Sequence, residues 1–192
     1  GLAFRLSTAW GIPIRAYSRH FSEKEFQSEY DTLTILLGCV DTTKARRSLH
    51  KALAHGNARN DSQTWLIDGG NLTTHGQVLI GNVVTDFNPQ QSFLLGNVCQ
   101  SLPAPALVHP ELIRRERRPV STPQRSCAEL AQADPQSLTI NSIIASHMAD
   151  YLLRLIITND LRRFATYIDM DTGSARSLAT IPTELVRVLG LP

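Results

Sequence analysis

The sequence is poor in the features that mark several common protein classes. It holds three cysteines (Cys39, Cys99 and Cys127), and no two of them form a C-x-x-C pair. Neither a zinc site built on such pairs nor a disulfide framework is therefore expected, and a reducing cytoplasm is the expected location. No run of about 18 apolar residues occurs, which argues against a transmembrane helix. The formal net charge is only +2, so the overall charge indicates neither a nucleic-acid partner nor a membrane surface.

What the chain does contain is a set of apolar segments typical of an α/β sheet. With 192 residues and 42% apolar content, it can bury one core. Leu33–Val40 is a continuous apolar run, which predicts a buried parallel strand with helices over both faces. A helix over 43–55 follows, and then strands over 64–68 and 77–84. We therefore expect a Rossmann-like sheet, mixed parallel and antiparallel, with helices on both sides.

Shorter signals predict the connecting structure. Residues 2–10 are expected to form a helix that ends at Gly11, and residues 12–19 alternate as a half-buried strand does. The triplet 69–71, Gly-Gly-Asn, predicts a turn, and Asp68 could cap it through backbone N–H groups.

The second half of the chain begins with a proline-rich crossover loop over 88–124. Apolar residues at three- and four-residue steps then predict a long buried helix over 138–157. Residues 163–178 read as a terminal β-hairpin. A short helix over 183–189 follows, and 1–192 is interpreted as a single domain.

Asp41 is the first candidate for chemistry. It follows the apolar run directly and precedes the 43–55 helix, and ligands of open α/β sheets bind beyond the carboxyl ends of strands. A carboxylate at this place can coordinate Mg²⁺ or contact a nucleotide. It can equally serve as the N-cap of the helix, and the position alone leaves both readings open.

Several segments resemble, in order, those of the ThiF-like adenylation family, to which ubiquitin-activating enzymes belong. The similarity is greatest to the ThiF family of the PRTRC system, a gene cassette of bacterial mobile elements. The segments are Thr34–Thr42 with Ala45-Arg46-Arg47, Trp65–Asn71 with Gly76-Gln77-Val78, Ser126–Glu129 with Leu138–Asn141, and Tyr167–Gly173.

This resemblance implies an activity and the residues that perform it. ThiF-like domains use Mg²⁺ and ATP to adenylate the C-terminal carboxylate of a small ubiquitin-like or sulfur-carrier protein, and they usually work as dimers. Asp41 would lie near the ATP phosphates and Mg²⁺, with Arg46 and Arg47 as further cofactor-binding residues. Cys127 is the candidate for a thioester step, or else an inert loop cysteine. Nucleic-acid and membrane partners are not implied.

The chain departs from the family at its most specific motif. ThiF-like domains begin with a strand and a G-x-G-G-x-G loop that cradles phosphate, and no such loop occurs here. We therefore expect an N-terminally truncated domain that lacks its first βαβ unit and in which Leu33–Val40 has lost a neighbouring strand. Such a chain alone should be poorly soluble or oligomeric. The alternative is a non-catalytic relative that dimerises or binds a partner; a nicotinamide-dependent enzyme would need the same missing loop.

Overall fold

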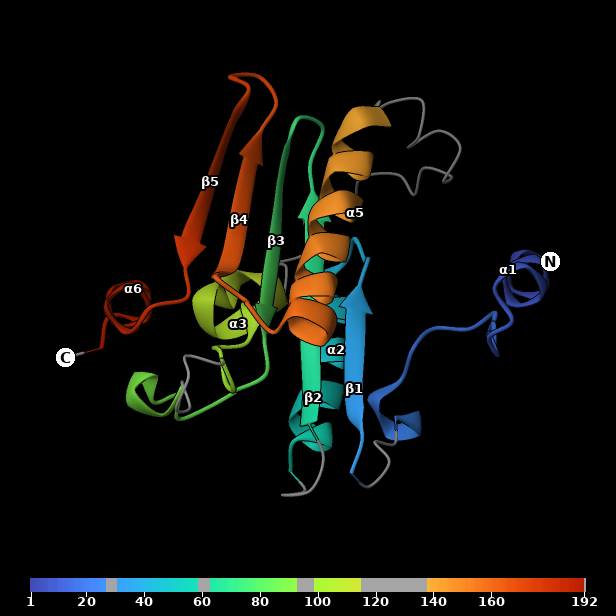
Figure 1. Cartoon of the computed structure of the whole chain (residues 1–192), viewed down its shortest axis with the longest axis horizontal. Helices are drawn as coiled ribbons and strands as arrows, with labels where there is room; N and C mark the ends of the chain where they lie inside the picture. Colours follow the sequence, from blue (N-terminus) through green and yellow to red (C-terminus); the bar gives the residue numbers. More distant parts are fainter. Residues whose placement is uncertain (27–30, 59–62, 93–98, 115–137, 192) are drawn as a thin grey trace, which may run out of the picture.

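The computed structural model of the protein describes residues 1–26, 31–58, 63–92, 99–114 and 138–191. A five-stranded sheet with the order β1-β2-β3-β4-β5 forms its centre (Figure 1). β1 and β2 are parallel, and each later neighbouring pair is antiparallel. The strands are β1 (Leu33–Gly38), β2 (Gln63–Asn71), β3 (His75–Gly81), β4 (Arg163–Asp169) and β5 (Ser174–Ala179). The helices are α1 (Leu2–Trp10), α2 (Thr43–Gly56), α3 (Pro105–Val108), α5 (Leu138–Leu153) and α6 (Pro182–Leu189), with helical turns η1 (Glu23–Glu25), η2 (Pro89–Gln91), η3 (Pro110–Ile113) and η4 (Arg154–Thr158).

Helices cover both faces of the sheet, so the predicted mixed α/β fold is confirmed. α2 and α3 lie on one face, and α5 crosses the other (Figure 1). Alternation along β2 explains the two layers, because successive strand residues point to opposite faces. Trp65 and Ile67 pack in the cluster that contains the buried residues of α5. Leu66 packs instead with Leu49 and Leu53 of α2.

Gly69 and Gly70 lie inside β2, so the predicted turn at 69–71 is wrong. The strand continues to Asn71, and residues 72–74 make the connection to β3. A Cβ atom added to Gly69 would lie only 2.4 Å from Sδ of Met148 on α5. The missing side chain thus permits close packing of helix on strand, and it does not mark a reversal of the chain.

β1 is an edge strand whose second face is covered only in part. Leu36 and Gly38 are buried on the α2 side. On the opposite face Leu33 and Leu37 are 46% and 50% exposed, while Ile35 between them packs against the α5-side cluster. Among the described residues, β1 pairs with β2 alone. The run was predicted to be a strand with helices over both faces, and the structure covers the second face only around Ile35.

The long helix continues past α5 into the π-helical turn η4. Ile140, Ile144, Met148 and Tyr151 are buried on the sheet side of α5, while Ile157 in η4 is exposed. The helix predicted over 138–157 is therefore present but is buried along one face only. By length and composition, the helical stretch Thr139–Thr158 is also sufficient to cross a membrane, a test that core helices of soluble proteins pass as well.

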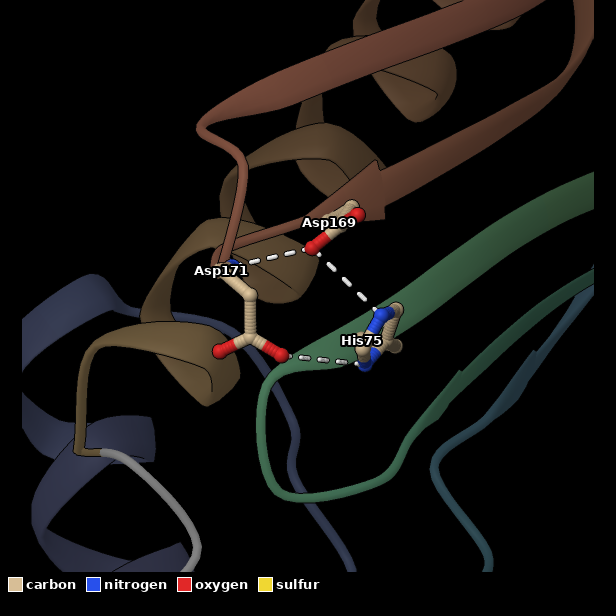
Figure 2. A group of neighbouring side chains, drawn as sticks. All are labelled: His75, Asp169 and Asp171. Carbon is tan, nitrogen blue, oxygen red and sulfur yellow. Dashed lines mark hydrogen bonds and ion pairs between the residues drawn. The ribbon is translucent and has the colours of Figure 1, made fainter.

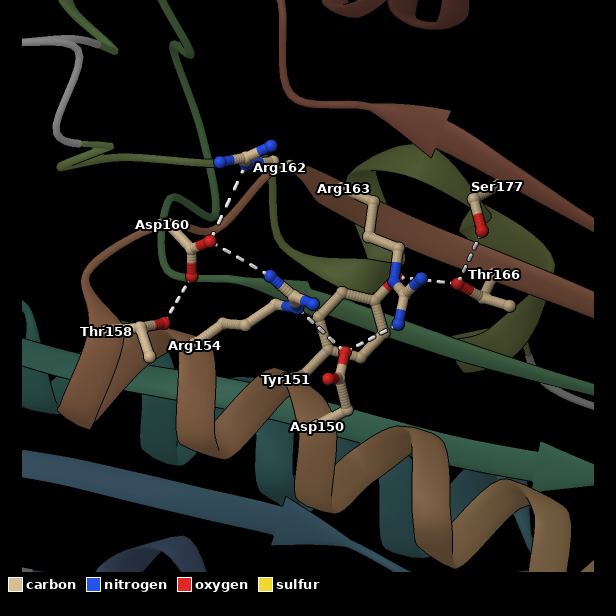
Figure 3. Close-up of polar contacts among 9 residues, drawn as sticks. All are labelled: Asp150, Tyr151, Arg154, Thr158, Asp160, Arg162, Arg163, Thr166 and Ser177. Carbon is tan, nitrogen blue, oxygen red and sulfur yellow. Dashed lines mark hydrogen bonds and ion pairs between the residues drawn. The ribbon is translucent and has the colours of Figure 1, made fainter.

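Polar contacts fasten α5 to the terminal hairpin (Figure 3). The Tyr151 hydroxyl lies 2.9 Å from the Thr166 hydroxyl, which is 2.9 Å from the Ser177 hydroxyl, so one chain of hydrogen bonds crosses from α5 to β4 and β5. Arg163 of β4 forms an ion pair with Asp150 of α5. Side chains on three elements are thereby held in a fixed relation at this end of the sheet.

The N-terminal segment stands away from the sheet (Figure 1). α1 ends at Gly11 in the left-handed conformation, with φ of 66°, as the sequence predicted. No residue of α1 is buried, and its large apolar side chains Phe4 and Trp10 are about three-quarters exposed. Residues 12–19 form no strand, so that prediction is wrong; their alternating pattern finds no neighbour to pair with among the described residues.

Candidate functional site

The junction of β1 and α2 places Asp41 just outside the helix. Thr42 is the N-cap of α2, since its Oγ1 accepts a hydrogen bond from the backbone N–H of Ala45 at 3.2 Å. Asp41 precedes this cap and is exposed. The interpretation of Asp41 as the N-cap is therefore wrong, and the carboxylate of Asp41 does not cap α2.

A large pocket of about 930 Å³ opens beside this junction. Val40 and Thr42, the two neighbours of Asp41, both line it, as do Lys44 and Arg47 on the first turns of α2. The N-terminal segment closes the other side through residues 19–21, which include Arg19 and His20. The N-terminus of a helix carries partial positive charge. Combined with these cationic side chains, it makes the pocket suited to an anion such as phosphate.

Arg46 points away from this pocket and pairs with Asp68 in the middle of β2. Its Nε lies 3.1 Å from Oδ2 of Asp68, whose side chain is 3% exposed. Burial raises the pKa of Asp68 to about 6, although the Arg46 guanidinium opposes the rise. Oδ1 has no hydrogen-bond partner among the described residues. It faces Gly38, where an added Cβ would approach it to 2.6 Å. The proposed capping of a turn by Asp68 is thus wrong.

A second pocket of about 480 Å³ lies on the far side of Arg46. Its polar lining comes mainly from β3 and the terminal hairpin: Gln77, His75, Tyr167, Asp169, Ser174 and Arg176. The Tyr167 hydroxyl lies 2.6 Å from Nε2 of His109, and burial raises the pKa of Tyr167. Sequence reasoning missed this pocket, because its walls meet only when β3 pairs with β4.

The three cysteines differ in their surroundings. Cys127 lies in the segment 115–137, outside the described residues. Cys39 belongs to the apolar run that was predicted to be a buried strand, but it is exposed just after β1, with its thiol 4.0 Å from Sδ of Met148. Burial raises the pKa of the Cys99 thiol to about 12. Cys99 is therefore protonated at neutral pH and is a poor nucleophile.

Comparison with known proteins leaves the family open. No protein-family model matches the chain, and a search of curated proteins finds no match either. The geometry places Arg47 in the wall of the larger pocket, leaves Asp41 between the wall residues Val40 and Thr42, and assigns Arg46 to a separate, buried ion pair. Any function for this junction consequently rests on the residues and on the resemblance described above.

Proposed function

We propose that the chain is the C-terminal part of a ThiF-like adenylating domain, with its nucleotide site at the junction of β1 and α2. The observation that carries this proposal is the cationic pocket of about 930 Å³ at the carboxyl end of β1. An open α/β sheet binds its ligands at this end of its strands. The same pocket adjoins Asp41, the residue that the resemblance assigns to Mg²⁺.

The donor set fits magnesium and a polyphosphate. The carboxylate of Asp41 is a hard oxygen ligand, which Mg²⁺ prefers. Lys44 and Arg47 line the pocket and would neutralise phosphate charge. Mg²⁺·ATP bound there would supply the adenylyl group for the C-terminal carboxylate of a small ubiquitin-like or sulfur-carrier protein. The Gly-rich loop that completes such a site in the family is not part of this sequence.

The second candidate is a non-catalytic module that forms a homodimer through β1. Its supporting observation is the open edge of β1, with Leu33 and Leu37 exposed on one face. An edge strand of this kind offers unpaired backbone groups to a second copy. A dimer through β1 is also compatible with the first candidate, because ThiF-like domains usually work as dimers, so the nucleotide site and the β1 interface can each fail without the other.

One set of samples tests both candidates. Thermal unfolding is measured with and without Mg²⁺·ATP, and the mass in solution by light scattering. At ATP tenfold above Kd, binding adds about 1.4 kcal/mol, or roughly 3–6 °C in Tm. Asp41→Ala and Arg47→Ala should remove this shift, and the remote, 83% exposed Arg162 provides Arg162→Ala as the matched control. Absence of a shift at millimolar ATP, or equal shifts in all variants, would refute the nucleotide site.

The mass decides the second candidate. We expect the unmodified chain to be dimeric or larger, and a Leu33→Ser/Leu37→Ser double variant to be monomeric while retaining its circular dichroism. A stable monomer for the unmodified chain would rule out the β1 interface without bearing on ATP binding.

A further inference from the structure

The sheet brings one histidine and two aspartates together where β3 begins and β4 ends. His75 and Asp169 are directly opposite each other in the antiparallel β3–β4 pair, and opposite residues project on the same face. Nε2 of His75 lies 3.4 Å from Oδ1 of Asp169. Asp171, in the turn after β4, places Oδ2 4.0 Å from Nδ1 of the same ring (Figure 2).

Hydrogen bonds hold the two carboxylates in place, and the Thr74 hydroxyl lies 3.0 Å from Nδ1 of His75. Oδ1 of Asp169 accepts the backbone N–H groups of Asp171 at 2.9 Å and Thr172 at 3.2 Å. The Thr74 hydroxyl donates to Oδ2 of Asp171 at 2.9 Å. These bonds hold the turn against the strand, so the cluster is organised before any ligand arrives. That is a requirement for a specific metal site.

The donor atoms are spaced for binding one divalent metal ion, and not only for pairing with each other. One ligand atom from each of the three residues lies within 4.8 Å of the other two. Bonds of about 2.1 Å to one ion would bring the donors to about 3–3.5 Å from each other, a contraction of roughly an ångström. Among the described residues, both carboxylates form ion pairs with His75 and neither does so with a lysine or arginine. Their negative charge is therefore available to a cation.

We propose that His75, Asp169 and Asp171 bind a divalent first-row transition ion of the Mn²⁺ type. One imidazole and two carboxylates form a hard, mixed N/O donor set, which suits Mn²⁺ and does not resemble the soft thiolate sites of zinc or copper. His75 and Asp169 also line the 480 Å³ pocket, together with the cationic Arg176. Three protein ligands leave coordination positions open, so water or an anionic oxygen of a molecule in this pocket could complete the shell.

The test is an electron paramagnetic resonance titration of Mn²⁺ with the full chain in the absence of nucleotide. Free Mn²⁺ gives a six-line signal that disappears on binding, and one equivalent should disappear per chain. His75→Gln and Asp171→Asn should each weaken binding by at least about tenfold. Asp169→Asn should do the same while keeping the turn, because the Asn Oδ1 can accept the same two N–H bonds. His55→Gln, at an exposed position at the end of α2, is the matched control and should leave binding unchanged.

Three results would overturn the proposal. One is unchanged free Mn²⁺ at millimolar ion with the unmodified chain, which would leave only an imidazole–carboxylate contact. Another is equal binding by a His75→Gln/Asp171→Asn double variant whose circular dichroism is native. An Asp41→Ala variant must bind Mn²⁺ like the unmodified chain. If it does not, the ion occupies the proposed nucleotide site instead and the site at the hairpin is refuted.

Discussion

Replacing Asp68 with asparagine should alter how the stability of the protein depends on pH. The Asp68 side chain is 3% exposed, and it accepts one hydrogen bond from Nε of Arg46 at 3.1 Å. Burial raises its pKa from 3.8 to about 6, against the opposing effect of Arg46. The free-energy cost of removing the carboxylate from water therefore exceeds the stabilisation that its single contact with the Arg46 guanidinium provides.

The sign follows from proton linkage. The folded state holds the Asp68 proton more tightly than the unfolded chain does, so the stabilisation is complete below pH 3.8 and is lost as the pH rises to about 6. At 1.36 kcal/mol per pH unit, that interval corresponds to roughly 3 kcal/mol. The amide introduced by Asp68→Asn cannot ionise, so the variant does not lose this stability as the pH rises. The free energy of unfolding of the wild type, minus that of Asp68→Asn, should thus fall by about 2–3 kcal/mol between pH 4 and pH 7.5.

Urea unfolding at several pH values measures this difference. Trp65 is 2% exposed and adjoins Leu66 on β2, so its fluorescence reports on the sheet around Asp68. Asp86→Asn is the matched control, because Asp86 is exposed and its positive φ of 51° suits asparagine. Subtracting the variant from the wild type cancels the other titrating groups. A difference that stays constant or grows with pH would show that Arg46 stabilises the carboxylate by more than burial costs, and would refute the reasoning.

Two further substitutions test how the layers are joined. The side-chain amide of Asn57 donates to the carbonyl oxygens of Thr64 and Asn82, at 2.9 and 2.7 Å, and accepts from the Thr64 N–H at 2.8 Å. Asn57→Ala removes these bonds, and urea unfolding should show that the free energy of unfolding falls by about 2–4 kcal/mol. A fall of less than about 1 kcal/mol would contradict this role. Gly69→Ala places a Cβ 2.4 Å from Sδ of Met148 and should cost about 1–3 kcal/mol. The cost should shrink in a Met148→Ala background; an equal cost in both backgrounds would assign it to the strand backbone.

Local sequence patterns predicted the parts of the fold that depend on near neighbours. The helix over 43–55 appears as α2, because its apolar residues recur on one face. The hairpin over 163–178 appears as β4 and β5, which a turn containing Gly173 at φ 67° connects. Such signals depend on spacing within a segment, so the sequence is sufficient to find them.

Features that depend on distant neighbours were not predictable in this way. An apolar run reads the same whether helices cover one face or two, so the exposure of Leu37 on β1 could not be anticipated. Gly69 was interpreted as a turn residue because the residues that pack against it belong to α5, which lies far along the chain and leaves no signal near Gly69. The pairing of His75 with Asp169 depends on the register between β3 and β4, which no local pattern specifies.

Arg46 and Arg47 show why a site predicted from adjacent residues can separate in three dimensions. Successive residues of an α-helix point about 100° apart, so neighbouring arginines on α2 face different surroundings. Arg47 lines the pocket next to Asp41, whereas Arg46 compensates the buried Asp68. Replacing Arg46 would leave an unpaired buried carboxylate and weaken the fold. Loss of ATP binding in an Arg46 variant would consequently report on the integrity of β2, whereas Arg47 and Lys44, which line the pocket, can probe phosphate contacts directly.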